Sequence, residues 1–296
     1  MGTKVIFHKN CVDGYTAAWI VNNVLFEAGN RDYSFFECGY SGRDKFIKEN
    51  FEKFAGQDLF LLDFSFKRDV LLKLASACKS ILVLDHHETA ERDLAGLDFA
   101  RFDINECGAT MTWKYFRPSD EIPKFVQYVK DYDLWKFDLP ASKAVNAFIR
   151  SFPCTIPFWD KLRSDIAEKF QDVLDQGSAI LRSNDRMIET LIEHAKPCWI
   201  MGHKAIAVNS TMLISEIGDK LKDKADVVII YGDNNRGGSF VSLRSKEVDV
   251  SRIAEHFGGG GHTHSSSFTE EFHTPHAWEM YSEGSITCQN SHIQSS

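Results

Sequence analysis

The sequence lacks the patterns that mark disulfide-rich, zinc-ribbon and membrane proteins. Its seven cysteines are odd in number, widely scattered and include no Cys-x-x-Cys pair. Its apolar runs, such as residues 227–231, fall far short of the roughly 20 residues that cross a bilayer. The N-terminus has no basic stretch followed by a long apolar one. We therefore expect a cytoplasmic protein with reduced thiols and no membrane segment.

The chain also lacks the basic excess that binding to long nucleic acid or anionic membranes by diffuse charge requires. Among 296 residues, 42 are acidic and 34 are Lys or Arg, which gives a formal net charge of −8. Any phosphate that the protein handles therefore needs a local site. The length predicts two domains, and 43% hydrophobic residues can build sizeable cores.

Short apolar runs alternate with amphipathic segments through the first half, which is typical of βαβ units and a parallel sheet. We expect strands at residues 5–7, 33–37, 59–62 and 81–84, and helices at residues 16–26 and 67–78. Helical spacing over residues 166–195 predicts a connector helix that ends at Lys196-Pro197, with Gly177 as a possible break.

After Pro197 the pattern predicts a second, smaller α/β domain. Strands are expected at residues 199–208, 227–231, 238–244 and 268–272, with helices at residues 212–221 and 250–257. The predicted fold class is thus α/β. It comprises an open parallel-sheet domain at 1–160, a helical connector at 161–196, a smaller C-terminal α/β domain at 197–283 and a disordered tail at 284–296.

Three of the expected strands end directly in a residue that can bind metal. These strand ends carry His8, Asp63 and the triplet Asp85-His86-His87. In open parallel sheets, ligands bind outside the carboxyl ends of the strands, so these residues can converge. Carboxylates and imidazoles together suit Mn²⁺, Mg²⁺ or Fe²⁺. Two divalent ions about 3.5 to 4 Å apart would offset the repulsion among the carboxylates and activate a water molecule.

These motifs together resemble the DHH phosphoesterase superfamily. The resemblance rests on Asp85-His86-His87, on His8 followed by Asp13-Gly14, and on the string 62–66, Leu-Asp-Phe-Ser-Phe. The strings 241–245, Val-Ser-Leu-Arg-Ser, and 257–262, Phe-Gly-Gly-Gly-Gly-His, are similar to the DHH-associated substrate-binding domain. The resemblance covers about residues 4–273, and the order of the motifs makes it specific.

The resemblance implies a set of metal ligands and catalytic groups. The implied metal ligands are His8, Asp13, Asp63, His86 and Asp131. Asp133 rivals Asp131 for the last place, Asp85 and Cys11 are further alternatives, and Asp63 is the implied bridging ligand. The implied catalytic residues are Asp63, Asp85, His86 and His87. Of these, His87 would stabilise the transferring phosphoryl group or protonate the leaving oxygen.

One position departs from the family pattern. Many members have two aspartates spaced Asp-x-Asp in the first motif, whereas this sequence has Cys11 in place of the earlier one. Cys11 could bind a metal as a thiolate or be an inert small residue. The sequence favours the inert alternative, because a soft thiolate suits hard-oxygen sites poorly. The Cys-containing first motif resembles the branch that includes nano-RNases.

A phosphate-binding group is expected in the second domain. Four successive glycines can bring backbone N–H groups close to an anion, and an arginine offers a bidentate fork to phosphate. The predicted substrate-binding residues are Arg244, Gly258, Gly259, Gly260, Gly261 and His262.

These features lead to the expectation of a phosphodiesterase with two divalent cations, Mn²⁺ in preference to Mg²⁺ or Fe²⁺. By resemblance, its substrates are very short oligoribonucleotides, especially linear dinucleotides such as linear diguanylate, which it would cleave to mononucleotides. No long nucleic acid or membrane is expected as a partner, and the protein would be a monomer or a homodimer.

The same motifs leave other functions open. The alternative enzymes are a polyphosphate or pyrophosphate hydrolase, a 3′-phosphoadenosine phosphate phosphatase and a cyclic nucleotide phosphodiesterase. A non-enzymatic alternative is a silent nucleotide-binding module that has lost one metal through the change at Cys11.

Overall fold

The computed structural model describes residues 2–40, 42–234 and 237–271, and the tail predicted at 284–296 lies outside this part. The chain divides into two compact units, Met1–Asn184 and Asp185–Ser296. The predicted α/β class is confirmed. Among the described residues, each helix is too short or too polar to cross a membrane.

Unit 1 begins with a sheet whose strands alternate with helices. The strands are β1 (Thr3–His8), β2 (Tyr33–Cys38), β3 (Asp58–Leu62), β4 (Ser80–Asp85) and β5 (Ala100–Phe102). The helices among and after them are α1 (Val12–Glu27), α2 (Arg43–Asn50), η1 (Phe51–Lys53, a 3₁₀ turn), α3 (Arg68–Ala77), α4 (Glu88–Leu94) and α5 (Gly108–Phe116).

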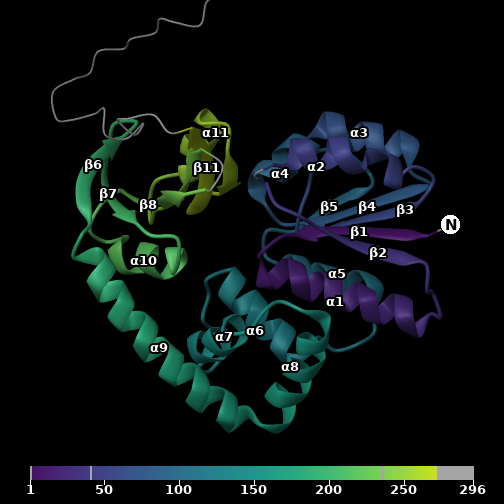
Figure 1. Ribbon diagram of the computed structural model, residues 1–296, viewed down its shortest axis with the longest axis horizontal. Coiled ribbons are helices and arrows are strands. Elements are labelled where there is room, and N and C mark those ends of the chain that lie inside the picture. The colour runs from purple at the N-terminus through teal and green to yellow at the C-terminus, as the bar shows by residue number, and fades with distance from the viewer. Residues whose placement is uncertain (1, 41, 235–236, 272–296) are drawn as a thin grey trace, which may run out of the picture. The chain divides into compact units, whose positions relative to one another are not determined.

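The five strands form one parallel sheet in the order β2-β1-β3-β4-β5. Helices α2, α3 and α4 cover one face, and α1 and α5 cover the other (Figure 1). Because both faces are covered, β1 has buried side chains on both sides, at Val5, Ile6 and Phe7. This confirms the predicted parallel sheet and explains why its strands read as apolar runs.

The rest of unit 1 is helical. It consists of α6 (Lys124–Asp133), α7 (Ser142–Arg150), α8 (Ile156–Glu168) and α9 (Phe170–Ile192), and α9 continues past the boundary of the unit. The single connector helix expected at residues 166–195 is therefore wrong at its start. The break falls at Lys169, and Gly177 lies inside α9. A glycine is required there because an added Cβ would come within 2.0 Å of the Ala144 carbonyl oxygen.

Unit 2 is a six-stranded sheet with helices on its two faces. After the end of α9 come β6 (Lys196–Ile200), β7 (His203–Asn209), α10 (Ile214–Leu221), β8 (Val227–Asp233), β9 (Gly238–Arg244), α11 (Val250–His256), β10 (Gly260–His262) and β11 (Ser265–Glu271). The strand predicted at 199–208 is two strands, because a turn at Met201-Gly202, both with positive φ, folds β7 back onto β6. Residue 272 of the last predicted strand lies outside the described residues.

The strand order in this sheet is β10-β11-β9-β8-β7-β6, and only β7 and β8 pair in parallel. Alternate residues of β8 face opposite layers. Val227 and Ile229 pack in the cluster that contains α11, whereas Val228 and Ile230 pack with Ile217 of α10. The pairing of the strands, in turn, fixes which strand ends lie side by side.

Candidate metal centre

Three metal-capable residues converge because their strands are neighbours. His8 ends β1, Asp63 follows β3, and Asp85 ends β4, and these strands are adjacent and parallel. Their carboxyl ends therefore meet at one edge of the sheet. Two helix ends reach the same edge, since Asp13 lies in the first turn of α1 and Asp133 in the last turn of α6.

Asp63 lies at the centre of this cluster. Its backbone has a φ of 54°, a left-handed conformation that is uncommon for a residue other than glycine. Its side chain is buried, with Oδ2 at 3.3 Å from His8 Nδ1 and Oδ1 at 3.2 Å from His86 Nε2. Among the described residues, no donor reaches either oxygen in hydrogen-bond geometry. Two buried carboxylate oxygens are thus available to a ligand.

His86 connects Asp63 with two further carboxylates. Its Nε2 lies 3.5 Å from Asp133 Oδ2 and 4.0 Å from Asp13 Oδ2. Asp13 is held in place by the N-terminus of α5, where the Gly108 and Ala109 N–H groups donate to its two oxygens at 2.6 and 2.8 Å. The positive end of α5 also offsets part of the negative charge that collects here.

Within unit 1, the donors sort into three groups that could each hold an ion. The groups are His8–Cys11–Asp63, Asp13–Asp63–His86 and Asp63–Asp85–His87, each with ligand atoms within 4.8 Å of one another. Asp63 belongs to all three. This is the position that a bridging ligand would occupy, as the resemblance implied.

The ionisation of the cluster shows why it suits a cation. Burial, together with Asp63 and Asp133, raises the pKa of Asp13 well above its usual range, and burial likewise raises the pKa of Asp133. Burial opposes ionisation of Asp63 too, but the close imidazoles of His8 and His86 hold its pKa well below the usual range. Several carboxylates therefore compete for too little positive charge, and divalent ions would supply what is missing.

The pKa of His86 also reflects the excess of negative charge in the cluster. Burial lowers its pKa, but Asp133, Asp63 and Asp13 outweigh burial and raise the pKa to about 10. Without a metal, the imidazole itself acts as the cation of the cluster. Because metal ligation requires a neutral imidazole, an ion would replace that proton. The residues present thus fit a divalent metal.

Asp85 and His87 form a separate pair beside this centre. Asp85 Oδ1 accepts from the His86 N–H at 2.8 Å and lies 2.7 Å from His87 Nδ1. The contact assigns the Nδ1 proton to His87 and fixes the orientation of its ring. Asp85 therefore orients His87, although its second oxygen is buried and accepts no hydrogen bond from the described residues.

The structure separates Asp131 from the metal cluster and brings Asp133 into it. Asp131 Oδ1 accepts from the Asp138 N–H at 2.9 Å, and Oδ2 accepts from the Leu139 N–H at 3.2 Å. Asp131 is thus engaged in holding the loop after α6. Asp133 Oδ2 is buried, accepts no hydrogen bond from the described residues and faces His86. The geometry therefore favours the alternative Asp133 over Asp131 as a ligand, because side chains two positions apart in a helix point in different directions.

Gly108 is a residue of the site that the sequence reasoning missed. A Cβ at this position would lie 2.5 Å from Asp63 Cβ and 2.9 Å from Asp13 Oδ2. Glycine therefore allows α5 to approach both aspartates closely enough for its N–H groups to bind Asp13. A search for metal-capable side chains cannot find such a residue. The only signal was a glycine at the start of an apolar helical stretch.

Cys11 lies between β1 and α1. Its Sγ belongs to the same donor group as His8 and Asp63. Burial and the charges of Asp63, Asp133 and Asp13 raise the pKa of Cys11 well above its usual range, whereas the Gly14 N–H lowers it. In the metal-free protein the thiol is therefore protonated.

An ion-pair cluster around the buried Glu106 links α5 and α6 beside the site, and it gives a prediction for acid stability. Glu106 Oε1 lies 2.8 Å from Lys114 Nζ of α5 and 2.7 Å from Lys130 Nζ of α6. Burial opposes the charge of Glu106, but the two lysines lower its pKa from 4.5 to about 2. A depressed carboxylate pKa stabilises the fold above the unfolded value and loses this effect as the pH falls.

Glu106→Gln is therefore expected to lower the free energy of unfolding of the metal-free protein at pH values above 4.5. The difference from wild type should shrink as the pH falls from 4.5 towards 2. Chemical denaturation at a series of pH values measures it. A difference that stays constant across this window would show that the two lysines do not set the ionisation of Glu106.

In unit 2, the predicted phosphate-binding residues meet at one end of the sheet. Ser265 of β11 lies opposite Arg244 of β9 and also opposite His262 of β10. The Arg244 guanidinium donates to Ser215 Oγ at 3.0 Å, beside the start of α10, and its stem packs over Gly218. The pairing of strands thus places Arg244 and His262 one strand apart.

The glycine run has a packing role in addition to its predicted one. A Cβ on Gly259 would lie 2.0 Å from the Ser267 carbonyl oxygen, and one on Gly261 would lie 2.7 Å from the Ser265 carbonyl oxygen. Gly258 and Gly261 have φ values of 79° and 141°. Close contact between β10 and β11 therefore requires glycines here, whether or not an anion binds.

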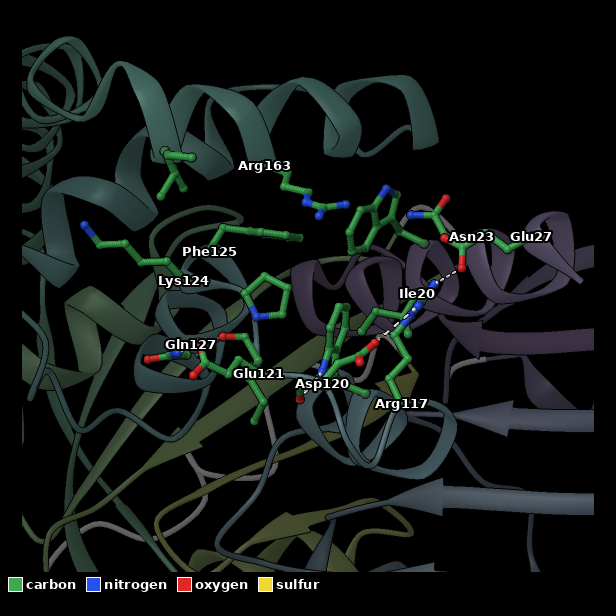
Figure 2. Close-up of a pocket in the computed structure, with 16 residues that line it drawn as sticks. Ile20, Asn23, Glu27, Arg117, Asp120, Glu121, Lys124, Phe125, Gln127 and Arg163 are labelled. Atoms are coloured by element: carbon green, nitrogen blue, oxygen red, sulfur yellow. Dashed lines mark hydrogen bonds and ion pairs between the residues drawn. The ribbon is translucent and has the colours of Figure 1, made fainter.

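A cavity of about 590 Å³ in unit 1 contains none of the predicted metal ligands. It is lined by residues of α1, α6 and α8 and of the α5–α6 segment (Figure 2). Its Arg117 is already paired, with Nη2 at 2.6 Å from Glu27 Oε2 and Nη1 at 3.4 Å from Asp120 Oδ2. Trp19 and Phe125 in its lining are almost fully buried and offer little surface for stacking. This cavity carries no functional argument.

Comparison with known sequences gives two related proteins, and no protein-family model matches the chain. The chain is 27% identical over 286 residues to the uncharacterized protein R106 of Acanthamoeba polyphaga mimivirus, covering 88% of this chain and 66% of that protein. It is 25% identical over 274 residues to oligoribonuclease NrnB of Bacillus subtilis, covering 79% of this chain and 65% of that protein. The chain thus spans just under two thirds of the length of these relatives.

Two solved structures share the fold over almost the whole chain. The pGpG-specific phosphodiesterase PggH from Vibrio cholerae has a TM-score of 0.50 and 12% identity, covering 92% of this chain and 94% of its own. An exopolyphosphatase-related protein from Bacteroides fragilis has a TM-score of 0.50 and 13% identity, covering 92% of this chain and 87% of its own. At such low identity these likenesses show the fold alone.

Proposed function

We propose that this chain is a DHH-type phosphoesterase, a metal-dependent phosphodiesterase that acts on very short oligoribonucleotides. The observation that carries this proposal is Asp63, a buried carboxylate whose oxygens accept no hydrogen bond from the described residues and which three potential metal-binding groups of unit 1 share. Oligoribonuclease NrnB, at 25% identity over most of the chain, supports the choice of substrate class.

Each residue has a role that follows from its position. We propose that His8, Asp13, Asp63, His86 and Asp133 hold two divalent ions, with Mn²⁺ as the preferred metal. Such ions would supply positive charge to the substrate phosphate and would activate a water molecule. Asp85 would orient the His87 ring, and His87 Nε2 would donate a proton to the leaving oxygen.

The second domain is proposed to bind a substrate phosphate. Arg244 and His262 lie one strand apart, and the hydrogen bond to Ser215 orients the guanidinium. A net charge of −8 opposes the binding of long polyanions, so affinity must come from a few directed groups. Substrates with few phosphates, such as linear dinucleotides, satisfy this condition. Linear diguanylate is the specific substrate that we propose.

The rate of hydrolysis is expected to fall with RNA length. With Mn²⁺ present, 5′-labelled RNAs of two to seven nucleotides should be cleaved fastest at two nucleotides, because each added phosphate brings repulsion without a new contact. Initial rates from gel or chromatographic separation measure this. Polyphosphate, cyclic dinucleotides and 3′-phosphoadenosine phosphate are included as competing substrates. Equal rates for all RNA lengths would contradict the short-substrate proposal. Faster cleavage of polyphosphate would show that polyphosphate, and not short RNA, is the substrate class.

A further inference from the structure

Cys11 occupies a distinct position within the cluster. It precedes α1 as its N-cap residue. Its Sγ lies with a His8 ring nitrogen and an Asp63 oxygen, all within 4.8 Å of one another. Asp63 is 1% exposed, and its oxygens accept no hydrogen bond from the described residues. A buried acceptor without a donor thus faces the same space as the thiol.

The structure removes the premise on which the sequence favoured an inert cysteine. That argument assumed that Cys11 would share an ion with many hard oxygen ligands. The oxygen-rich group is instead Asp13–Asp63–His86, with Asp133 beside it, whereas the group that contains Cys11 has a single carboxylate. Its donors are therefore one nitrogen, one sulfur and one oxygen, a set that suits ions of intermediate softness.

We propose that Cys11 binds a metal ion as a thiolate and thereby makes the two metal positions chemically different. The His8–Cys11–Asp63 position would take Zn²⁺, Fe²⁺ or Co²⁺, and the Asp13–Asp63–His86 position would take Mn²⁺ or Mg²⁺. As the sulfur–metal bond forms, the S–H bond breaks and its proton passes to solvent. The N-terminus of the 16-residue helix α1 favours the negative charge that develops on sulfur. This proposal rests on the two-ion centre of the proposed function and replaces its preference for Mn²⁺ at the position that contains His8.

Cobalt provides the test, because a thiolate bound to Co²⁺ has a charge-transfer absorption band in the near ultraviolet that oxygen and nitrogen ligands do not give. The full-length protein is stripped of metal, loaded with Co²⁺ under reducing conditions and examined by absorption spectroscopy, with cobalt content from elemental analysis. The wild type is expected to show the band, and Cys11→Ser is expected to lose it. Cys154→Ser is the matched control, since Cys154 is also half-buried in unit 1 and belongs to no donor group.

A second variant tests the metal preference. Cys11→Asp replaces sulfur by oxygen at the same position, so its affinity for Zn²⁺ should fall by roughly 10-fold or more relative to its affinity for Mn²⁺. Competition titration against a chelating indicator measures both affinities without any substrate. An unchanged preference would overturn the proposal.

The outcomes separate this proposal from the proposed function. A cobalt-loaded wild type that lacks the band, or a Cys11→Ser protein that retains it, overturns ligation by Cys11 whatever the activity. A protein that shows the band but does not hydrolyse short RNA supports ligation and contradicts the phosphodiesterase. Failure to bind any cobalt contradicts both.

Discussion

Asp63→Asn is expected to abolish hydrolysis while leaving the fold intact. Asp63 belongs to all three donor groups, so its replacement by a neutral amide weakens every proposed ion position at once. We expect kcat/KM to fall at least about 1000-fold, equivalent to about 4 kcal/mol of transition-state stabilisation. Steady-state kinetics on a dinucleotide measures the loss, and elemental analysis should show a matching loss of bound metal.

Asp58→Asn is the matched control for this variant. Asp58 lies at the opposite end of the same strand, β3, where its carboxylate pairs with Lys79 at 2.8 Å on the surface. Exposed pairs of this kind contribute up to about 1 kcal/mol to stability, so activity should not change. Full metal-dependent activity in Asp63→Asn would show that the two-ion centre is wrongly assigned.

Asp133→Asn is expected to have a far larger effect on activity than Asp131→Asn, although the two residues are only two positions apart. Asp133 faces His86 with an oxygen that the described residues leave without a donor, whereas Asp131 binds two backbone N–H groups. We expect Asp133→Asn to lower kcat by about 100-fold or more, about 2.7 kcal/mol, and to weaken metal binding.

The Asp131 variant should instead affect stability. Hydrogen bonds from backbone N–H groups to a charged carboxylate are stronger than those between neutral groups. Asp131→Asn should therefore lower the free energy of unfolding by about 1 to 3 kcal/mol. Chemical denaturation and metal titration on both variants distinguish the two roles. If Asp131→Asn loses metal and Asp133→Asn does not, the ligand assignment has to be reversed.

Much of unit 1 was predictable because its signals are local. The strands at residues 5–7, 59–62 and 81–84 are buried on both faces, so each reads as a continuous apolar run followed by a polar ligand. Parallel strands share one carboxyl edge, which is why His8, Asp63 and His86 could be grouped without coordinates.

Other parts of the site were not predictable because they depend on contacts between distant segments. The N–H groups that hold Asp13 belong to residues 108 and 109, which are 95 and 96 positions away. Gly108 has no side chain through which a motif could identify it. The helix break at Lys169 was missed as well. Glycine is a poorer helix former than lysine, so the sequence placed the possible break at Gly177. The structure keeps Gly177 inside the helix, where its contact with Ala144 leaves no room for a side chain.

The sequence by itself determined the α/β class and the convergence of His8, Asp63 and His86 at one edge of the first sheet. These follow from residue type, periodicity and charge, which are properties of the chain before it folds. Only the tertiary structure placed Asp133 beside His86 and Asp131 against the loop after α6, and grouped Cys11 with His8 and Asp63. Both depend on the direction of side chains relative to neighbouring elements, and that direction is set by packing rather than by spacing along the chain.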